Sequence, residues 1–208
     1  MLTTQSSTKK NGYYPVSDHP SLLPLEQNWQ KIQEEFLAID APILDIHRYK
    51  KSFEEVVAQV FSHVKQGGEY GWLHGWGKEG PNKDWLQYGL VVQGRAVDGV
   101  DKVCPVTMSL LSGISGIKVA AFLTLKSNTF LPGHAHPEIR GEGLLQYHLT
   151  LDSSEKLNLN YLNVNGVFAQ NKPGKAIVFD GSYYHFAVNA SPKDRTILYI
   201  EFKKQVAV

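Results

Sequence analysis

Three histidines in the C-terminal half of the sequence stand in a pattern suited to holding one metal ion. His134 and His136 are separated by a single residue, and His185 follows much later. Residues i and i+2 of a strand point to the same face, so this pair can offer two imidazoles while a distant strand supplies a third ligand. Imidazole suits iron(II), zinc and copper, and an open coordination face suits non-haem iron chemistry. Each histidine taken alone is more typical of a structural or surface residue.

A second set of residues surrounds His185 at fixed intervals. In chain order the set is Gly174, Phe179, Asp180, His185, Asn189 and Arg195. Arg195 has the planar fork that grips a carboxylate through two hydrogen bonds. Strand alternation places its side chain on one face together with Ile197 and Tyr199. The segment therefore predicts a histidine strand followed by an arginine strand.

These intervals resemble the motif of the aspartyl/asparaginyl β-hydroxylase family, and the resemblance covers nearly the whole chain. Residues 147–151 resemble the family's His-Leu-x-Leu strand, residues 104–107 its Cys-Pro-x-Thr turn, and residues 14–35 its opening segment. The resemblance implies an iron(II)- and 2-oxoglutarate-dependent dioxygenase that uses O₂. Such an enzyme hydroxylates an unactivated C–H, here of an aspartyl, asparaginyl or other amino-acid-like substrate.

The resemblance leaves open which histidines bind iron(II) together with His185. Alignment from the upstream strand selects His134, and counting back from His148 selects His136; a site built from all three is the third alternative. Pro137 limits the backbone before it to extended conformations, so we expect a strand that ends at His136. This favours His136 as a ligand, with His134 as a third ligand or as a residue that orients it.

For the cosubstrate, the resemblance implies that Arg195 and His148 hold the distal carboxylate of 2-oxoglutarate. Alternation places Gln146 on the same strand face as His148. The family commonly has an arginine where Gln146 stands, so one cation is missing from the expected pocket. Arg140, in the loop before this strand, is a candidate to compensate and to contact substrate, although a charged turn is the commoner interpretation of such a loop.

Short strands must position these residues. Runs rich in β-branched and aromatic residues alternate with turn residues from about residue 85 onward. The expected strands are Gln87–Val92, Val119–Leu125, Leu144–Leu151, Leu157–Val164, Ala176–Phe179, Tyr183–Val188 and Thr196–Phe202. Strands and helices do not alternate regularly, which argues against a doubly wound parallel sheet. We expect a mainly β protein, a double-stranded β-helix of the jelly-roll or cupin-like kind, buttressed by N-terminal helices.

Two helical patterns precede the strands. Apolar residues recur at helical spacing within residues 29–36. Ser52 and Glu55 form a capping box before an apolar stripe that ends at Gly67. A short helix is also expected to begin at Pro105. We expect one oxygenase domain over residues 1–208, with a loose lead-in at 1–17, a helical buttress at 18–84 and a β-barrel core at 85–208.

Composition limits the partners and the compartment. Lys plus Arg is 21 against 20 for Asp plus Glu, so no charge excess indicates a nucleic-acid or membrane partner. No secretory signal or bilayer-length apolar run is recognisable. Cys104 is the single cysteine and is expected to be a small buried apolar residue. We expect a soluble, cytoplasmic enzyme that acts on a small molecule, peptide or protein; the oligomeric state is not indicated.

Two other functions fit part of the pattern. The His-x-His pair, with His185 and Asn189, also resembles a cupin, which predicts a metal-dependent dioxygenase or isomerase that does not use 2-oxoglutarate. The spacing of Arg195 argues against this interpretation, because a cupin has no need of that arginine. A binding protein on a degenerate oxygenase fold would require a lost metal ligand, and the sequence shows none clearly lost.

Overall fold

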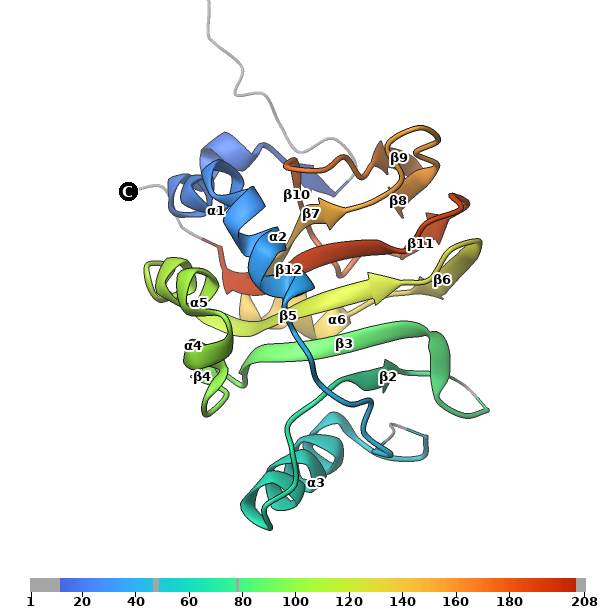
Figure 1. Ribbon diagram of the computed structural model, residues 1–208. Helices are drawn as coiled ribbons and strands as arrows, with labels where there is room; N and C mark the ends of the chain where they lie inside the picture. Colours follow the sequence, from blue (N-terminus) through green and yellow to red (C-terminus); the bar gives the residue numbers. More distant parts are fainter. Residues whose placement is uncertain (1–11, 47–48, 78, 205–208) are drawn as a thin grey trace, which may run out of the picture.

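The strands form two antiparallel sheets (Figure 1). Residues of both sheets line a common cavity. The computed structural model describes residues 12–46, 49–77 and 79–204. The larger sheet has the order β1-β10-β7-β12-β5-β3-β2 with β4 paired to β3, and the smaller sheet has the order β6-β11-β8-β9. This arrangement confirms the expected double-stranded β-helix of the jelly-roll or cupin-like class.

The elements have the following bounds. The larger sheet contains β1 (Tyr13–Tyr14), β2 (Leu73–Gly75), β3 (Asn82–Val92), β4 (Arg95–Ala96), β5 (Ile117–Leu125), β7 (Leu144–Asp152), β10 (Ala176–Phe179) and β12 (Arg195–Lys203). The smaller sheet contains β6 (Thr129–His134), β8 (Asn160–Val164), β9 (Val167–Gln170) and β11 (His185–Asn189). The α-helices are α1 (Leu23–Gln27), α2 (Trp29–Leu37), α3 (Phe53–Lys65), α4 (Val100–Val103), α5 (Pro105–Ser112) and α6 (Pro137–Glu142), and two short 3₁₀ turns, η1 (Val16–Asp18) and η2 (Pro20–Leu22), precede α1.

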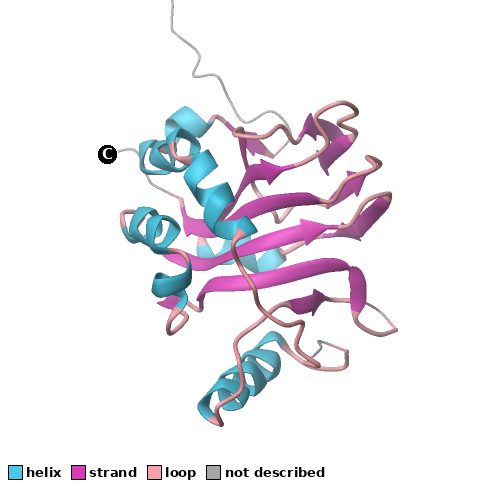
Figure 2. Ribbon diagram, in the orientation of Figure 1, coloured by secondary structure: helices cyan, strands magenta, loops and turns pink. Residues whose placement is uncertain are grey.

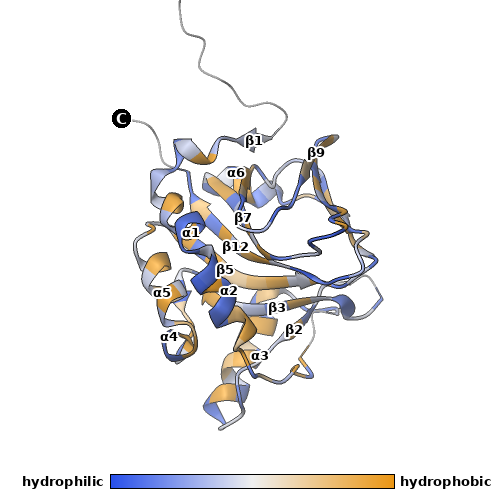
Figure 3. Ribbon diagram, turned by 45° about the horizontal axis from the view of Figure 1, so that its top comes forward, coloured by the Kyte–Doolittle hydropathy of each residue, from blue (hydrophilic) through white to orange (hydrophobic). Residues whose placement is uncertain are grey.

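Helices cover the outer face of the larger sheet (Figure 2). Phe122 of β5 and Leu198 of β12 belong to the main core, which also holds Ile32 of α2 and Leu111 of α5. Hydrophobic residues lie along β5, β12 and α5 (Figure 3). Successive strand residues alternate between the two faces of a sheet. The residues of β5 and β12 that alternate with these core residues in sequence therefore face the cavity. Helix α3 lies apart from the other helices, beside β2 at the edge of the sheet (Figure 1).

All seven expected strands are present, although their ends differ. The largest shift is in β3, which begins at Asn82 instead of Gln87. The expected helical buttress, residues 18–84, also contains β2, because a strand of three residues leaves too little alternation to recognise. The expected lead-in is partly ordered. Tyr13 pairs with β10 and donates hydrogen bonds to two carbonyl oxygens of the smaller sheet, and residues 1–11 lie outside the described residues.

The expected strand ending at His136 is wrong, since β6 ends at His134 and α6 begins at Pro137. Proline is favoured at the first helical position, where its missing N–H is not needed and its φ suits the helix. Ile139 is buried and anchors α6 against the barrel. The segment expected to be a charged loop is therefore a short helix, and His136 lies just before its first turn.

Other local expectations are confirmed. Ser52 and Glu55 form the capping box at the start of α3, and α5 begins at Pro105. Cys104 is fully buried, and burial raises the pKa of its thiol to about 12. Within the part of the chain that is described, no helix is long and apolar enough to cross a bilayer.

Candidate functional site

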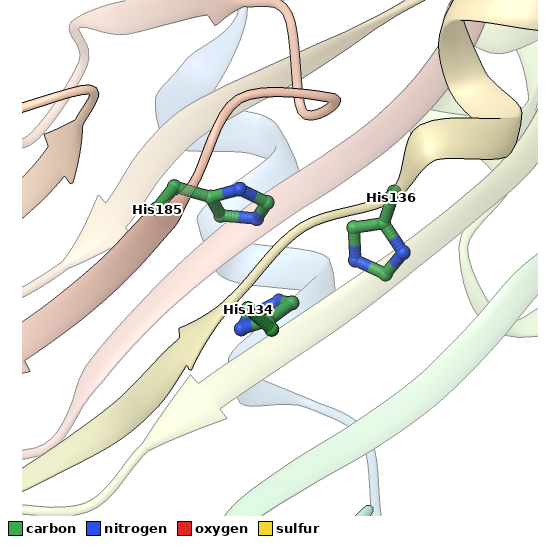
Figure 4. A group of neighbouring side chains, drawn as sticks. All are labelled: His134, His136 and His185. Atoms are coloured by element: carbon green, nitrogen blue, oxygen red, sulfur yellow. The ribbon is translucent and has the colours of Figure 1, made fainter.

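The three histidines converge on one point between the two sheets (Figure 4). His134 ends β6 and stands opposite His185 of the neighbouring strand β11 in the antiparallel register. His136 reaches the same point from the turn between β6 and α6. One ring nitrogen from each histidine lies within 4.8 Å of the other two. The structure therefore brings together all three histidines that the sequence singled out.

Each of these imidazoles is oriented by a hydrogen bond at Nδ1. The acceptors are the Pro132 carbonyl for His134 at 2.7 Å, the Tyr183 carbonyl for His185 at 2.8 Å and the Glu138 carboxylate for His136 at 3.1 Å. A carbonyl or carboxylate oxygen only accepts, so Nδ1 carries the proton and Nε2 keeps its lone pair. Metal-binding histidines are commonly fixed in this way. Glu138 was not among the predicted site residues, although it follows His136 by only two positions.

The surroundings favour the neutral form of His134 and His185. Burial lowers the pKa of His185 to about 4, and the nearby His134 and His136 lower it further against the opposing effect of the Tyr183 carbonyl. Burial is also the main cause that lowers the pKa of His134. The neutral imidazole is the form that binds a metal. At neutral pH His134 and His185 therefore need not lose a proton before they bind an ion.

A cavity of about 420 Å³ opens beside the three histidines. Its walls come from both sheets and from the start of α3. The side chains from the larger sheet are Trp85, Gln87, Lys118, Val119, Ala121, Leu123, Leu125, Gln146, His148, Arg195, Ile197, Tyr199 and Glu201. The smaller sheet adds Leu131, Leu162, Phe186 and Ala187 beside the histidines, and Phe53 and Glu54 belong to α3. The predicted face shared by Arg195, Ile197 and Tyr199 is thus a wall of this cavity.

Arg195 is a buried cation without an acidic partner. Its side chain makes no hydrogen bond or ion pair among the described residues, its Nε has no acceptor, and the residue is 4% exposed. Burial lowers the pKa of the guanidinium to about 10, so the group stays charged at neutral pH. An unpaired buried charge is costly, and an anion that enters the cavity relieves that cost.

His148, on the neighbouring strand β7, stands opposite Tyr199 in the register and lines the same cavity as Arg195. It packs edge-on against Phe179, with ring centroids 4.9 Å apart, and against Tyr199 at 5.5 Å. Burial, followed by the charge of Arg195 and by His185, holds the pKa of His148 well below its usual value. Its Nδ1 is buried without a hydrogen-bond partner. A neutral imidazole and a guanidinium thus face the same part of the cavity.

Gln146 and Arg140 have different surroundings from those expected. Gln146 lines the cavity, but its Nε2 donates to the Tyr199 hydroxyl at 2.7 Å, and that hydroxyl donates to Glu201. Arg140 lies outside the cavity and is exposed, with its guanidinium 5.2 Å from the centre of the Tyr183 ring. Because Arg140 is not among the residues that line the cavity, its expected contact with substrate stays a prediction.

Asn189 explains how His185 and Arg195 keep their relative positions. Its Nδ2 lies within 2.9–3.1 Å of the carbonyl oxygens of Leu125, Lys126 and Lys193. These contacts tie the end of β11 to the end of β5 and to the turn before β12. The two strands that carry the histidine and the arginine are held together at this point.

The family comparison agrees with the geometry. The model of the aspartyl/asparaginyl beta-hydroxylase family matches residues 26–205. The chain belongs to this family. A curated relative, an ornithine lipid ester-linked acyl 2-hydroxylase of Rhizobium tropici, is 30% identical over 120 residues, which is 58% of this chain. The match spans 42% of that relative's length. Family and relative together indicate a hydroxylase of the aspartyl/asparaginyl β-hydroxylase type.

Solved structures show more distant likenesses. An HTH_3 family transcriptional regulator from Vibrio cholerae has a TM-score of 0.45 and 11% identity, covering 75% of this chain and 66% of that one. A predicted oxalate decarboxylase from Thermotoga maritima has a TM-score of 0.38 and 15% identity, covering 58% of this chain and 81% of that one. The two antiparallel sheets of this family member themselves place it in the cupin-like class.

Proposed function

We propose that the chain is an iron(II)- and 2-oxoglutarate-dependent dioxygenase that hydroxylates an unactivated C–H bond. The observation that carries the proposal is the presence, in one cavity, of three convergent imidazoles and a buried arginine that has no acidic partner. The imidazoles suit a metal ion, and the arginine suits the distal carboxylate of a ketoacid that chelates that ion.

The histidine set fits iron(II) on its donor chemistry. Three imidazoles, each with its Nδ1 in a hydrogen bond, can occupy one face of an ion through Nε2 and leave the remaining positions open. We propose that His134, His136 and His185 are all ligands, so that a third imidazole takes the place of the carboxylate common in non-haem iron oxygenases. Bound iron supplies the redox chemistry that couples dioxygen and the decarboxylation of 2-oxoglutarate to succinate with hydroxylation of the substrate.

The residues of the cavity wall would position the cosubstrate. The Arg195 guanidinium can grip the distal carboxylate of 2-oxoglutarate through two charge-assisted hydrogen bonds. His148, which is neutral and lines the same cavity, can donate a further one. Burial of both groups strengthens these contacts and keeps water away from them. In a cupin-type enzyme that does not use 2-oxoglutarate, the buried charge of Arg195 would have no anionic partner, which favours the present proposal.

The substrate is an amino-acid-like molecule or an acyl chain. Family membership supports the first class. A second, apolar pocket supports the other, because it adjoins the cavity through shared walls at Phe53, Gln87, Val119 and Ala121. It lies between α3 and the larger sheet, has a volume of about 70 Å³, and is lined mainly by apolar residues, among which valine is the commonest. The relative from Rhizobium tropici is named for the hydroxylation of an acyl chain.

Turnover of 2-oxoglutarate tests the proposal. Purified protein is supplied with iron(II), 2-oxoglutarate and air, and succinate is measured by NMR with either an N-acyl amino acid or an asparagine-containing peptide. We expect iron-dependent succinate formation that His185→Ala abolishes, and stimulation by one of the two substrates identifies its class. Succinate formation that persists unchanged in His185→Ala would contradict the proposed site.

A further inference from the structure

The cavity wall formed by β12 carries opposite charges at its two ends. Arg195, Ile197, Tyr199 and Glu201 alternate along this strand and all line the cavity. Arg195 and Glu201 are six residues apart, which corresponds to roughly 20 Å along a strand. If Arg195 binds the cosubstrate, as proposed above, Glu201 lies at the other end of this wall, away from the distal carboxylate of the cosubstrate.

The carboxylate of Glu201 is held in place. It accepts a hydrogen bond from the Tyr199 hydroxyl, which itself accepts one from Gln146 Nε2 at 2.7 Å. Gln146 stands directly opposite Glu201 in the register of β7 and β12. Because both neighbours are neutral, they orient the carboxylate without balancing its charge.

No cation of the cavity wall neutralises Glu201. Lys118 pairs with Glu142 at 2.5 Å, and Lys51 donates to Gln59 at 2.9 Å. Arg195 lies at the far end of the same strand. Among the described residues Glu201 has no ion-pair partner, although it is only half-buried on a cavity wall that also carries these three cations.

We propose that Glu201 binds a positively charged ammonium group of the substrate. The inference rests on the proposed function and deepens it by naming one chemical group of the substrate. An ammonium offers three donors and the opposite charge, and its hydrogen bond to a carboxylate is charge-assisted. Glu201 acts here as a specificity-determining residue, with Tyr199 and Gln146 as the residues that position it.

The apolar pocket beside α3 begins next to this carboxylate. Val119 lines both that pocket and the cavity, and it stands directly opposite Glu201 in the register of β5 and β12. A ligand with an ammonium group on Glu201 can therefore extend an apolar chain past Val119 into the pocket. The site is built for a cationic amphiphile, and a simple alkylammonium ion is the appropriate probe.

The test compares n-octylamine, which is protonated at neutral pH, with n-octanol. Trp76 and Trp85 line the cavity, so tryptophan fluorescence of the Mn(II)-loaded protein reports binding without turnover. We expect the wild type to bind octylammonium at least about tenfold more tightly than octanol, as one hydrogen bond to a charged group implies. Glu201→Gln should remove this preference, Tyr199→Phe should reduce it, and Glu54→Gln, at another cavity carboxylate, should keep it.

Each outcome supports or overturns the inference. Equal binding of the two probes by the wild type would show that the carboxylate only holds Tyr199 in place. A preference that survives in Glu201→Gln would assign it to another group, such as a bound metal that the amine coordinates. Titrations of the wild type with Mn(II) and 2-oxoglutarate separate the two proposals. If neither binds while the Glu201-dependent preference holds, the proposed function fails and the ammonium site stands.

Discussion

His134 and His185 lie opposite each other on neighbouring antiparallel strands, with ring centroids 4.4 Å apart. The pairing of β6 with β11 thus sets the distance between two of the three imidazoles. A slip of one residue would turn one of these side chains to the opposite face of its strand. The contacts of Asn189 at the far end of β11 oppose such a slip.

Loss of either His134 or His136 should weaken metal binding strongly. Both place a ring nitrogen at the proposed metal position, so each substitution to alanine removes one ligand. Mn(II) titration of His134→Ala and His136→Ala measures the effect, with His74→Ala on β2, outside the cavity, as the matched control. Affinity close to the wild type in one of the two variants would reduce the site to two histidines and would identify which one orients its neighbour.

Arg195→Met should bind 2-oxoglutarate about a hundredfold more weakly than the wild type, because two hydrogen bonds to a charged group are lost. Methionine fills most of the volume of the arginine stem, so the core should stay packed. Calorimetric titration of the Mn(II)-loaded protein gives the affinity. Lys193→Ala, two residues away, removes only an exposed ion pair with Asp152 and should bind 2-oxoglutarate as the wild type does.

The strands that carry the site were predictable because each is long enough to show alternation. Alternation within residues 144–151 placed His148 on the correct face, and alternation with Ile197 and Tyr199 did the same for Arg195. Glu201 follows the same alternation as Arg195, although it was not singled out. The position of His136 was not predictable in the same way. It depends on α6, a helix of six residues whose single buried anchor, Ile139, leaves no periodic pattern.

Contacts between residues far apart in the sequence could not be predicted either. The apolar residues of α2 indicated a helix, but nothing indicated that Glu35 would cap a different helix. Its carboxylate accepts hydrogen bonds from the backbone N–H groups of Val106 and Thr107, at 2.6 and 2.8 Å, and from the Thr107 hydroxyl at 2.6 Å. Such a contact depends on how α2 and α5 pack on the sheet.

Glu35→Ala should therefore destabilise the fold. The substitution leaves two N–H groups in the first turn of α5 without their acceptor, and we expect the free energy of unfolding to fall by roughly 1–3 kcal/mol. Urea denaturation followed by circular dichroism measures the change. The neighbouring Glu34 is exposed, and Glu34→Ala should unfold at the wild-type urea concentration. Equal midpoints for both variants would show that the contact contributes no net stability.

The stability of the metal-free protein should depend on pH. The pKa of His185 is about 4 in the fold and near 6.5 in an unfolded chain, so the unfolded state binds more protons between these values. The free energy of unfolding should therefore rise with pH across this window. The contribution of His185 to that stability is lost as the pH falls from about 6.5 towards 4. The lowered pKa values of His134 and His148 act in the same direction.

Urea midpoints of the metal-free protein at about pH 5 and about pH 7.5 measure this dependence. His185→Gln should shrink the difference between the two midpoints, because glutamine does not titrate. A difference as large as that of the wild type would mean that other groups dominate the pH response.

The dependence of 2-oxoglutarate binding on the metal tests the central claim most directly. Anaerobic calorimetry compares the titration of 2-oxoglutarate into metal-free and iron(II)-loaded protein. Because the ketoacid end is proposed to chelate the ion while Arg195 holds the distal carboxylate, we predict one equivalent bound with much higher affinity when iron is present, and a reciprocal gain in iron affinity. Tight iron binding through the three histidines, together with an affinity for 2-oxoglutarate that iron does not change, would contradict the account.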